Sequence, residues 1–212
     1  MSRVIDLSHP ISPEMPVWPG TPAPEIRPLA SIAEDGFAEQ SIRLSSHTGT
    51  HLDAPAHMIE GGASLDRFGP GQFFGRAVVV DARASAGGVI GAGLLKSSGA
   101  AFADADFVLL HTGWARLWGQ AGYDFGYPVL DDEAAGWLSG LRLKGVGIDA
   151  PSFDTADSHD YPVHRRLLRA AFLLIENLDN LHLLPPSGTM VAVFPLPVES
   201  AEACPVRAVA IL

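Results

Sequence analysis

Four uninterrupted apolar runs constrain this chain more than any other feature, because few kinds of sheet accommodate them. The runs are Ala77–Asp81, Asp106–His111, Gly145–Asp149 and Phe172–Glu176. A half-exposed strand alternates apolar and polar residues, whereas these runs are apolar at successive positions and are shorter than most helices. Each run therefore predicts a buried strand in a sheet that other elements cover on at least one face.

The segments around these runs carry helix signals. We expect helices near Gly91–Ser97, near Trp114–Gln120, over Asp132–Leu141 and over Arg165–Ala171. Asp131 is placed to cap the third helix, and Asp160 to cap the fourth, with Pro162 in its first turn. Met190–Pro195 and Val206–Leu212 are expected to add strands to the main sheet. Strands that alternate with helices predict the α/β class.

The first third of the chain is rich in proline and more β-like. Prolines at positions 10, 13, 16, 19, 22, 24 and 28 exclude a helix or a central strand and predict an extended surface loop after a short strand at Arg3–His9. Trp18 in this loop has two interpretations, a packing residue or a rigid aromatic wall over a binding site. From Phe37 to Ser46, Ile42 and Leu44 alternate with polar residues, which predicts a half-buried strand.

Composition limits the class of protein. With 212 residues, of which 47% are apolar and 18% charged, the chain can bury one sizeable core, and we expect a single domain over residues 1–212. No apolar run has the length of a membrane span, and Asp6 stands where a signal peptide would be apolar, so a cytoplasmic protein is expected. The formal net charge of −10 disfavours nucleic acid as a partner, and the single cysteine, Cys204, excludes an internal disulfide.

The chemistry is concentrated in the segment His47-Thr-Gly-Thr-His-Leu-Asp-Ala-Pro-Ala-His57. His47, His51 and Asp53 are candidate metal ligands, because imidazole nitrogen and carboxylate oxygen suit zinc, manganese or iron. A straight strand would separate the α-carbons of His47 and His51 by roughly 13 Å. A shared ion therefore requires a bend, which Gly49 can provide. The proline before His57 stiffens the chain and favours a different role for this histidine.

A second group of polar residues lies more than a hundred positions later. His164 is expected at a helix start and Glu176 at the end of an apolar strand, where a carboxylate is either exposed or buried beside a cation or metal. Asp149 and Asp154 either support ligand histidines or form ordinary turns. Of the other histidines, we expect His111 in the core, His9 beside the site or at the end of the first strand, and His159 and His182 at the surface.

Together these segments resemble the metal-dependent cyclase-like hydrolase family, which includes bacterial kynurenine formamidase and isatin hydrolase. The resemblance rests on the histidine segment and on Asp6-Leu-Ser-His9, Pro16-Val-Trp-Pro-Gly20, Gly147-Ile-Asp-Ala-Pro-Ser152, His164 and Glu176. It covers nearly the whole chain. It implies a single compact α/β domain of the swivelling β/β/α type with a mixed central sheet, assembled as a homodimer or homotetramer.

The same resemblance assigns roles to the candidate residues. The implied ligands are His47, His51 and Asp53 for a first ion, with His164 and Glu176 completing the site or holding a second ion. His57 corresponds to the catalytic general acid or base, and Trp18 to the aromatic residue that faces the substrate. The implied cofactor is a divalent metal, with Zn²⁺ expected ahead of Mn²⁺.

The implied activity is that of a metal-dependent amidohydrolase acting on small aryl formamides or cyclic amides. The first expectation is an activity like that of kynurenine formamidase (arylformamidase), an enzyme of tryptophan catabolism. The alternative is opening of a cyclic amide or lactone, as in isatin hydrolase. Thr50 and Asn177 differ from the residues of kynurenine formamidase itself, so the choice of small aromatic amide stays open.

Two other classes also fit two histidines and one carboxylate. One is a mononuclear iron oxygenase, which leaves His57 and the distant His164 and Glu176 without a function. The other is a non-catalytic metal-binding protein, which predicts a closed ion that coordinates no water.

Overall fold

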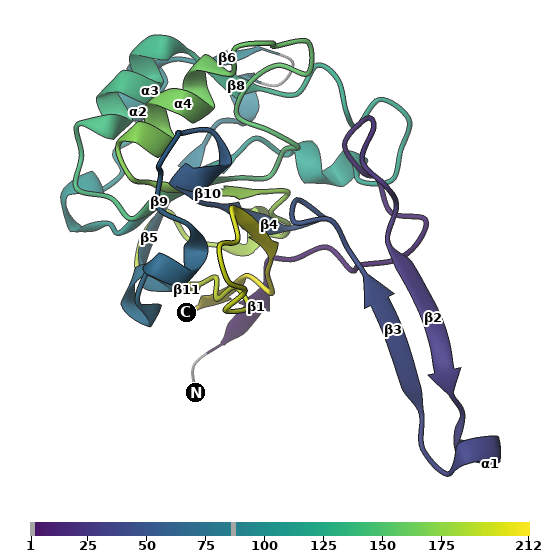
Figure 1. Cartoon of the computed structure of the whole chain (residues 1–212). Coiled ribbons are helices and arrows are strands. Elements are labelled where there is room, and N and C mark those ends of the chain that lie inside the picture. The colour runs from purple at the N-terminus through teal and green to yellow at the C-terminus, as the bar shows by residue number, and fades with distance from the viewer. Residues whose placement is uncertain (1–2, 86–87) are drawn as a thin grey trace.

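The four apolar runs form the centre of a nine-stranded sheet in a computed structural model that describes residues 3–85 and 88–212 (Figure 1). They correspond to the strands β5 (Phe74–Asp81), β7 (Phe107–His111), β9 (Gly145–Ile148) and β10 (Leu173–Glu176). These four strands lie side by side in that order and run parallel. The predicted positions of all four strands are confirmed.

Antiparallel strands extend this parallel centre on both sides. On one side lie β11 (Thr189–Ala192), β13 (Val209–Ile211) and β1 (Val4–Asp6), and on the other β4 (His51–Asp53) and β12 (Ala203–Pro205). The sheet is therefore mixed, and the α/β class is confirmed. The sequence did not predict β4 and β12 as strands, because a three-residue strand is too short to show an alternating pattern.

The central strands are apolar at successive positions because both faces of the sheet are buried. In β5, Val78 and Val80 belong to one core, whereas Val79 belongs to the core on the opposite face. Ile5 of β1 and Cys204 of β12 both belong to this second core, although their strands form the two edges of the sheet. The sheet therefore curls, so that its two edges enclose a shared core.

Three helices cover the first face: α2 (Ala92–Ser97), α3 (Asp132–Ser139) and α4 (Pro162–Arg169). The predicted cap of α3 is confirmed, since the Asp131 carboxylate accepts the backbone N–H of Ala134. The helix expected near Trp114–Gln120 is only a short 3-10 helix, Trp114–Leu117. It ends close to Gly119, whose left-handed backbone (φ 74°) does not continue a helix.

The predicted cap of α4 is wrong. Tyr161 occupies the N-cap position in a left-handed conformation (φ 46°), and its side chain accepts no capping hydrogen bond. Instead, the Asp154 carboxylate accepts the N–H groups of Val163 and His164 at 3.0 and 2.9 Å. The free N–H groups at the start of a helix bind whichever carboxylate the tertiary structure brings to them. Asp160 is closer in sequence, but Asp154 is the carboxylate that the fold places there.

The shorter elements occupy the connections between the main strands and helices. They are the strands β6 (Val89–Ile90) and β8 (Val129–Leu130) and the 3-10 helices Pro55–His57, Leu65–Arg67, Pro70–Phe73, Arg83–Ser85, Phe102–Asp104 and Leu181–Leu183. None of the helices in the described part of the chain has the length and apolar character needed to cross a membrane.

A hairpin arm projects from the body of the protein (Figure 1). It consists of β2 (Glu25–Ala30), α1 (Ile32–Asp35) and β3 (Glu39–Arg43). Residues 31–43 are all exposed, and Ile42 remains 60% exposed. The predicted strand is confirmed as β3, but its predicted half-burial is wrong, because an alternating pattern shows that a strand has an apolar face and does not show what covers that face.

Candidate metal centre

Strands β4 and β10 place three polar side chains in the interior. His51 and Asp53 are two residues apart on β4, so their side chains point to the same face of the sheet. Glu176 of β10 pairs directly with His51 across the two antiparallel strands. Glu176 is only 6% exposed, which excludes the interpretation that it emerges into solvent.

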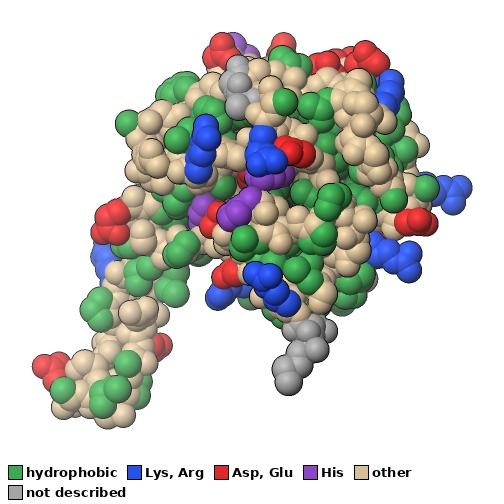
Figure 2. All heavy atoms as spheres, turned by 180° about the vertical axis from the view of Figure 1, so that it is seen from behind, with side chains coloured by type: hydrophobic (Ala, Val, Ile, Leu, Met, Phe, Trp, Pro, Cys, Tyr) green, Lys and Arg blue, Asp and Glu red, His purple; other side chains and the backbone are tan. Residues whose placement is uncertain are grey.

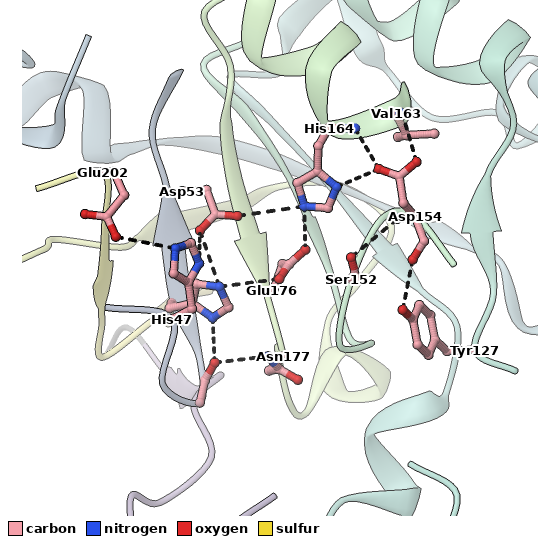
Figure 3. A network of polar contacts seen from close by, with 12 residues as sticks. His47, Asp53, Tyr127, Ser152, Asp154, Val163, His164, Glu176, Asn177 and Glu202 are labelled. Carbon is pink, nitrogen blue, oxygen red and sulfur yellow. Dashed lines mark hydrogen bonds and ion pairs between the residues drawn. The ribbon is translucent and has the colours of Figure 1, made fainter. Parts of the chain in front are cut away.

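Helix α4 brings His164 to the same place. The chain turns back between Arg169 and Leu173, so the start of α4 lies level with the end of β10 (Figure 3). His164 Nε2 lies 3.0 Å from Glu176 Oε1, and its Nδ1 lies 2.7 Å from Asp154 Oδ2. Because a carboxylate beside Nδ1 accepts its hydrogen, the neutral His164 ring directs the Nε2 lone pair towards the centre of the cluster.

His47 reaches the cluster through the bend that the sequence predicted. Gly49 adopts the left-handed conformation (φ 62°) between His47 and the start of β4. The His47 and His51 rings lie 5.0 Å apart between centroids, and His47 Nδ1 lies 2.9 Å from Asp53 Oδ1. Residues 47, 51 and 53 therefore converge, as a shared ion requires.

Several atoms of this cluster are buried without a hydrogen-bond partner, which is the test of whether the residues fit a metal. Within the described residues, His51 Nε2 and both carboxylate oxygens of Asp53 are such atoms. Leaving buried polar atoms unpaired costs free energy, and a bound cation would satisfy all of them. The possible ligands form two sets that share Asp53. One set is His47, His51 and Asp53, and the other is Asp53, His164 and Glu176. Within each set the ligand atoms lie within 4.8 Å of one another. Imidazole nitrogens with carboxylate oxygens suit a divalent ion, so the residues present fit the cofactor.

The electrostatics of the cluster also call for positive charge. Burial disfavours the charged form of His51, but Asp53 and Glu176 outweigh this effect and raise its pKa well above the usual value. Burial also disfavours the charged form of His164. Asp154 and Glu176 outweigh this effect and raise the pKa of His164 to about 10. In the absence of an ion, protons on these rings neutralise the two carboxylates.

The cluster forms the floor of a cavity of about 270 Å³. In the space-filling view, histidine side chains gather near the middle of the visible face of the body (Figure 2). The lining residues are Pro16, Val17, Trp18, Thr21, His47, Gly49, His51, Asp53, His57, Met58, Tyr123, Asp124, Pro151, Ser152, Tyr161, His164, Glu176 and Asn177. Trp18 lines this cavity and also packs against the core that the helices cover, so its packing role is confirmed and its role over a binding site stays a prediction.

His57 lies in the cavity beside the ligand candidates and not among them. The stiff segment after β4 places its ring 4.2 Å from the His47 ring and 6.2 Å from the His164 ring, between centroids. Burial is the main cause that lowers its pKa, and the attraction of Asp53 offsets only part of this effect. A neutral imidazole at this position can accept a proton at neutral pH.

Sequence reasoning missed several residues of the site. Glu202 accepts a hydrogen bond from the Ser46 hydroxyl at 2.5 Å and lies 3.6 Å from His47 Nε2. It precedes β12, which pairs with β4, and the sequence carries no signal for this pairing. Tyr123 and Asn177 line the cavity. Glu202, Tyr123 and Asn177 come from three separate segments that only the folded sheet and its loops bring together.

Other polar residues lie outside the cluster. Asp149 accepts hydrogen bonds from the backbone and hydroxyl of Thr112 and from the Gly113 N–H, so it does not support a histidine. The ring of His9 stacks on Trp118 at 3.9 Å between centroids. His111 is buried, and His159 and His182 are exposed, as predicted.

Comparisons with known proteins place the chain among similar sequences and folds. The model of the Cyclase family ("Putative cyclase") matches residues 5–155. A kynurenine formamidase of Salinibacter ruber is 35% identical over 97% of this chain and 96% of its own length. Isatin hydrolase A from Ralstonia solanacearum has a TM-score of 0.90 at 28% identity, over 100% of this chain and 92% of that one. A predicted metal-dependent hydrolase from Bacillus stearothermophilus has a TM-score of 0.83 at 27% identity, over 100% and 98%.

The two aspartates that the sequence left undecided give a direct test. Replacing Asp154→Asn removes the carboxylate that orients His164, and we expect affinity for Zn²⁺ to fall by about 10- to 100-fold. Replacing Asp149→Asn weakens only the contacts to Thr112 and Gly113, so it should lower the melting temperature without a comparable loss of affinity. Competition of the metal-free proteins with a chromophoric chelator measures the affinities. Equal metal affinity in both variants would contradict the role of Asp154.

Proposed function

The chain belongs to the Cyclase family, and on that premise we propose that it is a divalent-metal-dependent amidohydrolase that acts on a small aromatic amide. The observation that carries this proposal is the set of buried, unpaired ligand atoms of His51 and Asp53 on the floor of a cavity that also contains His57. The similar proteins named kynurenine formamidase and isatin hydrolase support the reaction class.

The ligands proposed for the metal are His47, His51 and Asp53 for one ion, with His164 and Glu176 completing the site or holding a second ion. Three imidazoles and two carboxylates favour Zn²⁺, and Mn²⁺ is the alternative. The bound metal supplies a Lewis acid that polarises the amide carbonyl and lowers the pKa of water.

The proton transfers are assigned to His57. Its neutral imidazole can take a proton from the attacking water, and the resulting imidazolium can return that proton to the leaving nitrogen. Its ring lies beside the ligand histidines in the same cavity, so one side chain can serve both steps. The lowered pKa keeps the ring in the neutral form that accepts the first proton.

The substrate is proposed from the walls of the cavity. A volume of about 270 Å³ lies just below the range of small-molecule sites, roughly 300 to 1,000 Å³, which suits a small ligand of one or two rings. Trp18 offers an aromatic surface for such a ring. An aryl formamide such as N-formylkynurenine is the first candidate, and a cyclic amide such as isatin is the second, because isatin hydrolase shares the fold at a TM-score of 0.90.

Assays on both substrates test the proposed reaction. We expect the Zn²⁺- or Mn²⁺-loaded protein to hydrolyse N-formylkynurenine, the metal-stripped protein to lose this activity, and added metal to restore it. Turnover should be the same with and without oxygen, whereas an iron oxygenase would stop under anaerobic conditions. Hydrolysis of isatin alone would move the function to cyclic amide opening, and no hydrolysis of either compound would contradict the proposal.

Replacement of His57→Gln tests the proton-transfer assignment. We expect kcat to fall by about 10²- to 10⁴-fold, the usual range for loss of a general acid or base, while metal content stays at the wild-type level. The matched control is His159→Gln, which changes an exposed histidine and should keep full activity. Unchanged turnover in metal-loaded His57→Gln would show that another group transfers the proton.

We also propose that the arm joins copies of this chain, as expected for a homodimer or homotetramer. The arm exposes Leu29, Ile32, Phe37 and Ile42, and the segment after β11 exposes Phe194, Leu196 and Val198. Apolar side chains gathered on a projecting hairpin are typical of an interface and disfavour an isolated chain in water. A second copy of this chain offers the same surfaces in return, as the symmetry of a homodimer requires.

The arm proposal predicts a change in molecular mass. Light scattering coupled to size exclusion should give at least twice the mass of one chain for the wild type, and the double variant Leu29→Lys and Ile42→Lys should shift towards a single chain. A double variant at Phe125 and Val89, which are exposed outside the arm, is the control and should keep the wild-type mass. A wild-type protein with the mass of one chain would refute the proposal.

A further inference from the structure

The bend at Gly49 brings the ligands together but leaves the following peptide plane free to rotate unless other contacts hold it. Gly49 makes the bend possible through its left-handed conformation, but a glycine has no side chain to restrict the peptide plane that follows it. The Gly49 carbonyl accepts the Nδ1–H of His51 at 2.8 Å. The orientation of this one carbonyl therefore decides which nitrogen of His51 faces the metal site.

The side chain of Asn177 holds that carbonyl in place. Its Nδ2 donates to the Gly49 carbonyl at 3.1 Å, and its Oδ1 accepts the Tyr123 hydroxyl at 2.7 Å. The two contacts fix which end of the carboxamide faces which partner, because a carbonyl oxygen can only accept. Burial raises the pKa of Tyr123 well above its usual value, so the phenol keeps the hydrogen that it donates.

A second hydrogen bond ties the same two segments together. The Thr50 hydroxyl donates to the backbone carbonyl of Asn177 at 2.6 Å, and its oxygen accepts the N–H of His9 at 3.0 Å. Asn177 is itself in the left-handed conformation (φ 56°), which asparagine tolerates better than most residues. The backbone geometry at position 177 would therefore also suit glycine, whereas the hydrogen bond to Gly49 needs a side chain that can donate.

We propose that Asn177 is a positioning residue whose carboxamide, oriented by Tyr123, locks the Gly49 carbonyl so that His51 presents Nε2 to the metal. The inference rests on the proposed function only in taking His51 as a metal ligand. With both lone pairs of the Gly49 oxygen occupied, the His51 ring keeps Nδ1 protonated, and Nε2 points at Asp53 and Glu176, 3.3 and 3.4 Å from their oxygens. Outer partners of this kind orient ligand histidines in metal sites.

The variant Asn177→Gly tests this role, because it keeps the left-handed backbone and removes only the carboxamide. We expect the affinity of the metal-free protein for Zn²⁺ to fall by about 10- to 100-fold in chelator competition. In the Zn²⁺-loaded protein, the ¹⁵N and ¹H signals of His51 Nδ1–H should shift or broaden. Tyr123→Phe, which loses one hydroxyl, should change both readouts in the same direction and by less.

Asn180→Gly is the matched control. Asn180 is also left-handed (φ 58°), and its carboxamide donates to the Asp6 carbonyl at 3.0 Å and to the Asp179 carboxylate at 3.3 Å, neither of which belongs to a proposed ligand. It should lose a similar amount of thermal stability and keep wild-type Zn²⁺ affinity. Wild-type affinity in Asn177→Gly, or an equal loss in Asn180→Gly, would overturn the inference. Full Zn²⁺ binding by the wild type without hydrolysis of either substrate would overturn the proposed function alone.

Discussion

The burial of two neighbouring carboxylates, Asp53 and Glu176, is the constraint on which the site depends. Each raises the energy of the other's charge in a poorly solvated interior, so positive charge must lie between them. Protonated His51 and His164 supply it when no ion is bound, and a divalent ion can replace both protons. The hydrogen bonds from Nδ1 of His51 to Gly49 and from Nδ1 of His164 to Asp154 hold both rings with Nε2 towards the carboxylates.

Local signals made much of this predictable. The apolar runs predicted the central strands because a buried strand shows its burial in its own composition. His47, His51 and Asp53 were found because they lie within one short segment, and the need for a bend followed from chain dimensions, with Gly49 as the residue that provides it. These inferences needed no knowledge of what packs against the segment.

The remaining features depend on contacts between distant segments. The cap of α4 comes from Asp154 and not from Asp160, and Glu202 joins the site through a strand of three residues. The exposed strand of the arm has the alternating pattern of a covered strand, because apolar and polar residues alternate around Ile42 whether or not another element covers the apolar face. Asn177 gave no sign of its hydrogen bond to Gly49, which lies 128 positions earlier. Such contacts are consequences of topology, which a local pattern does not contain.

The place of β4 in the sheet has a consequence for synthesis of the chain. This strand carries His51 and Asp53, yet it pairs only with β10 and β12, whose residues follow more than a hundred positions later. A ribosome therefore completes the histidine segment long before its partners emerge, and pairing over such separations is slow. Newly made chains must hold this segment without its sheet, so His51 and Asp53 can meet Glu176 only after β10 has been made.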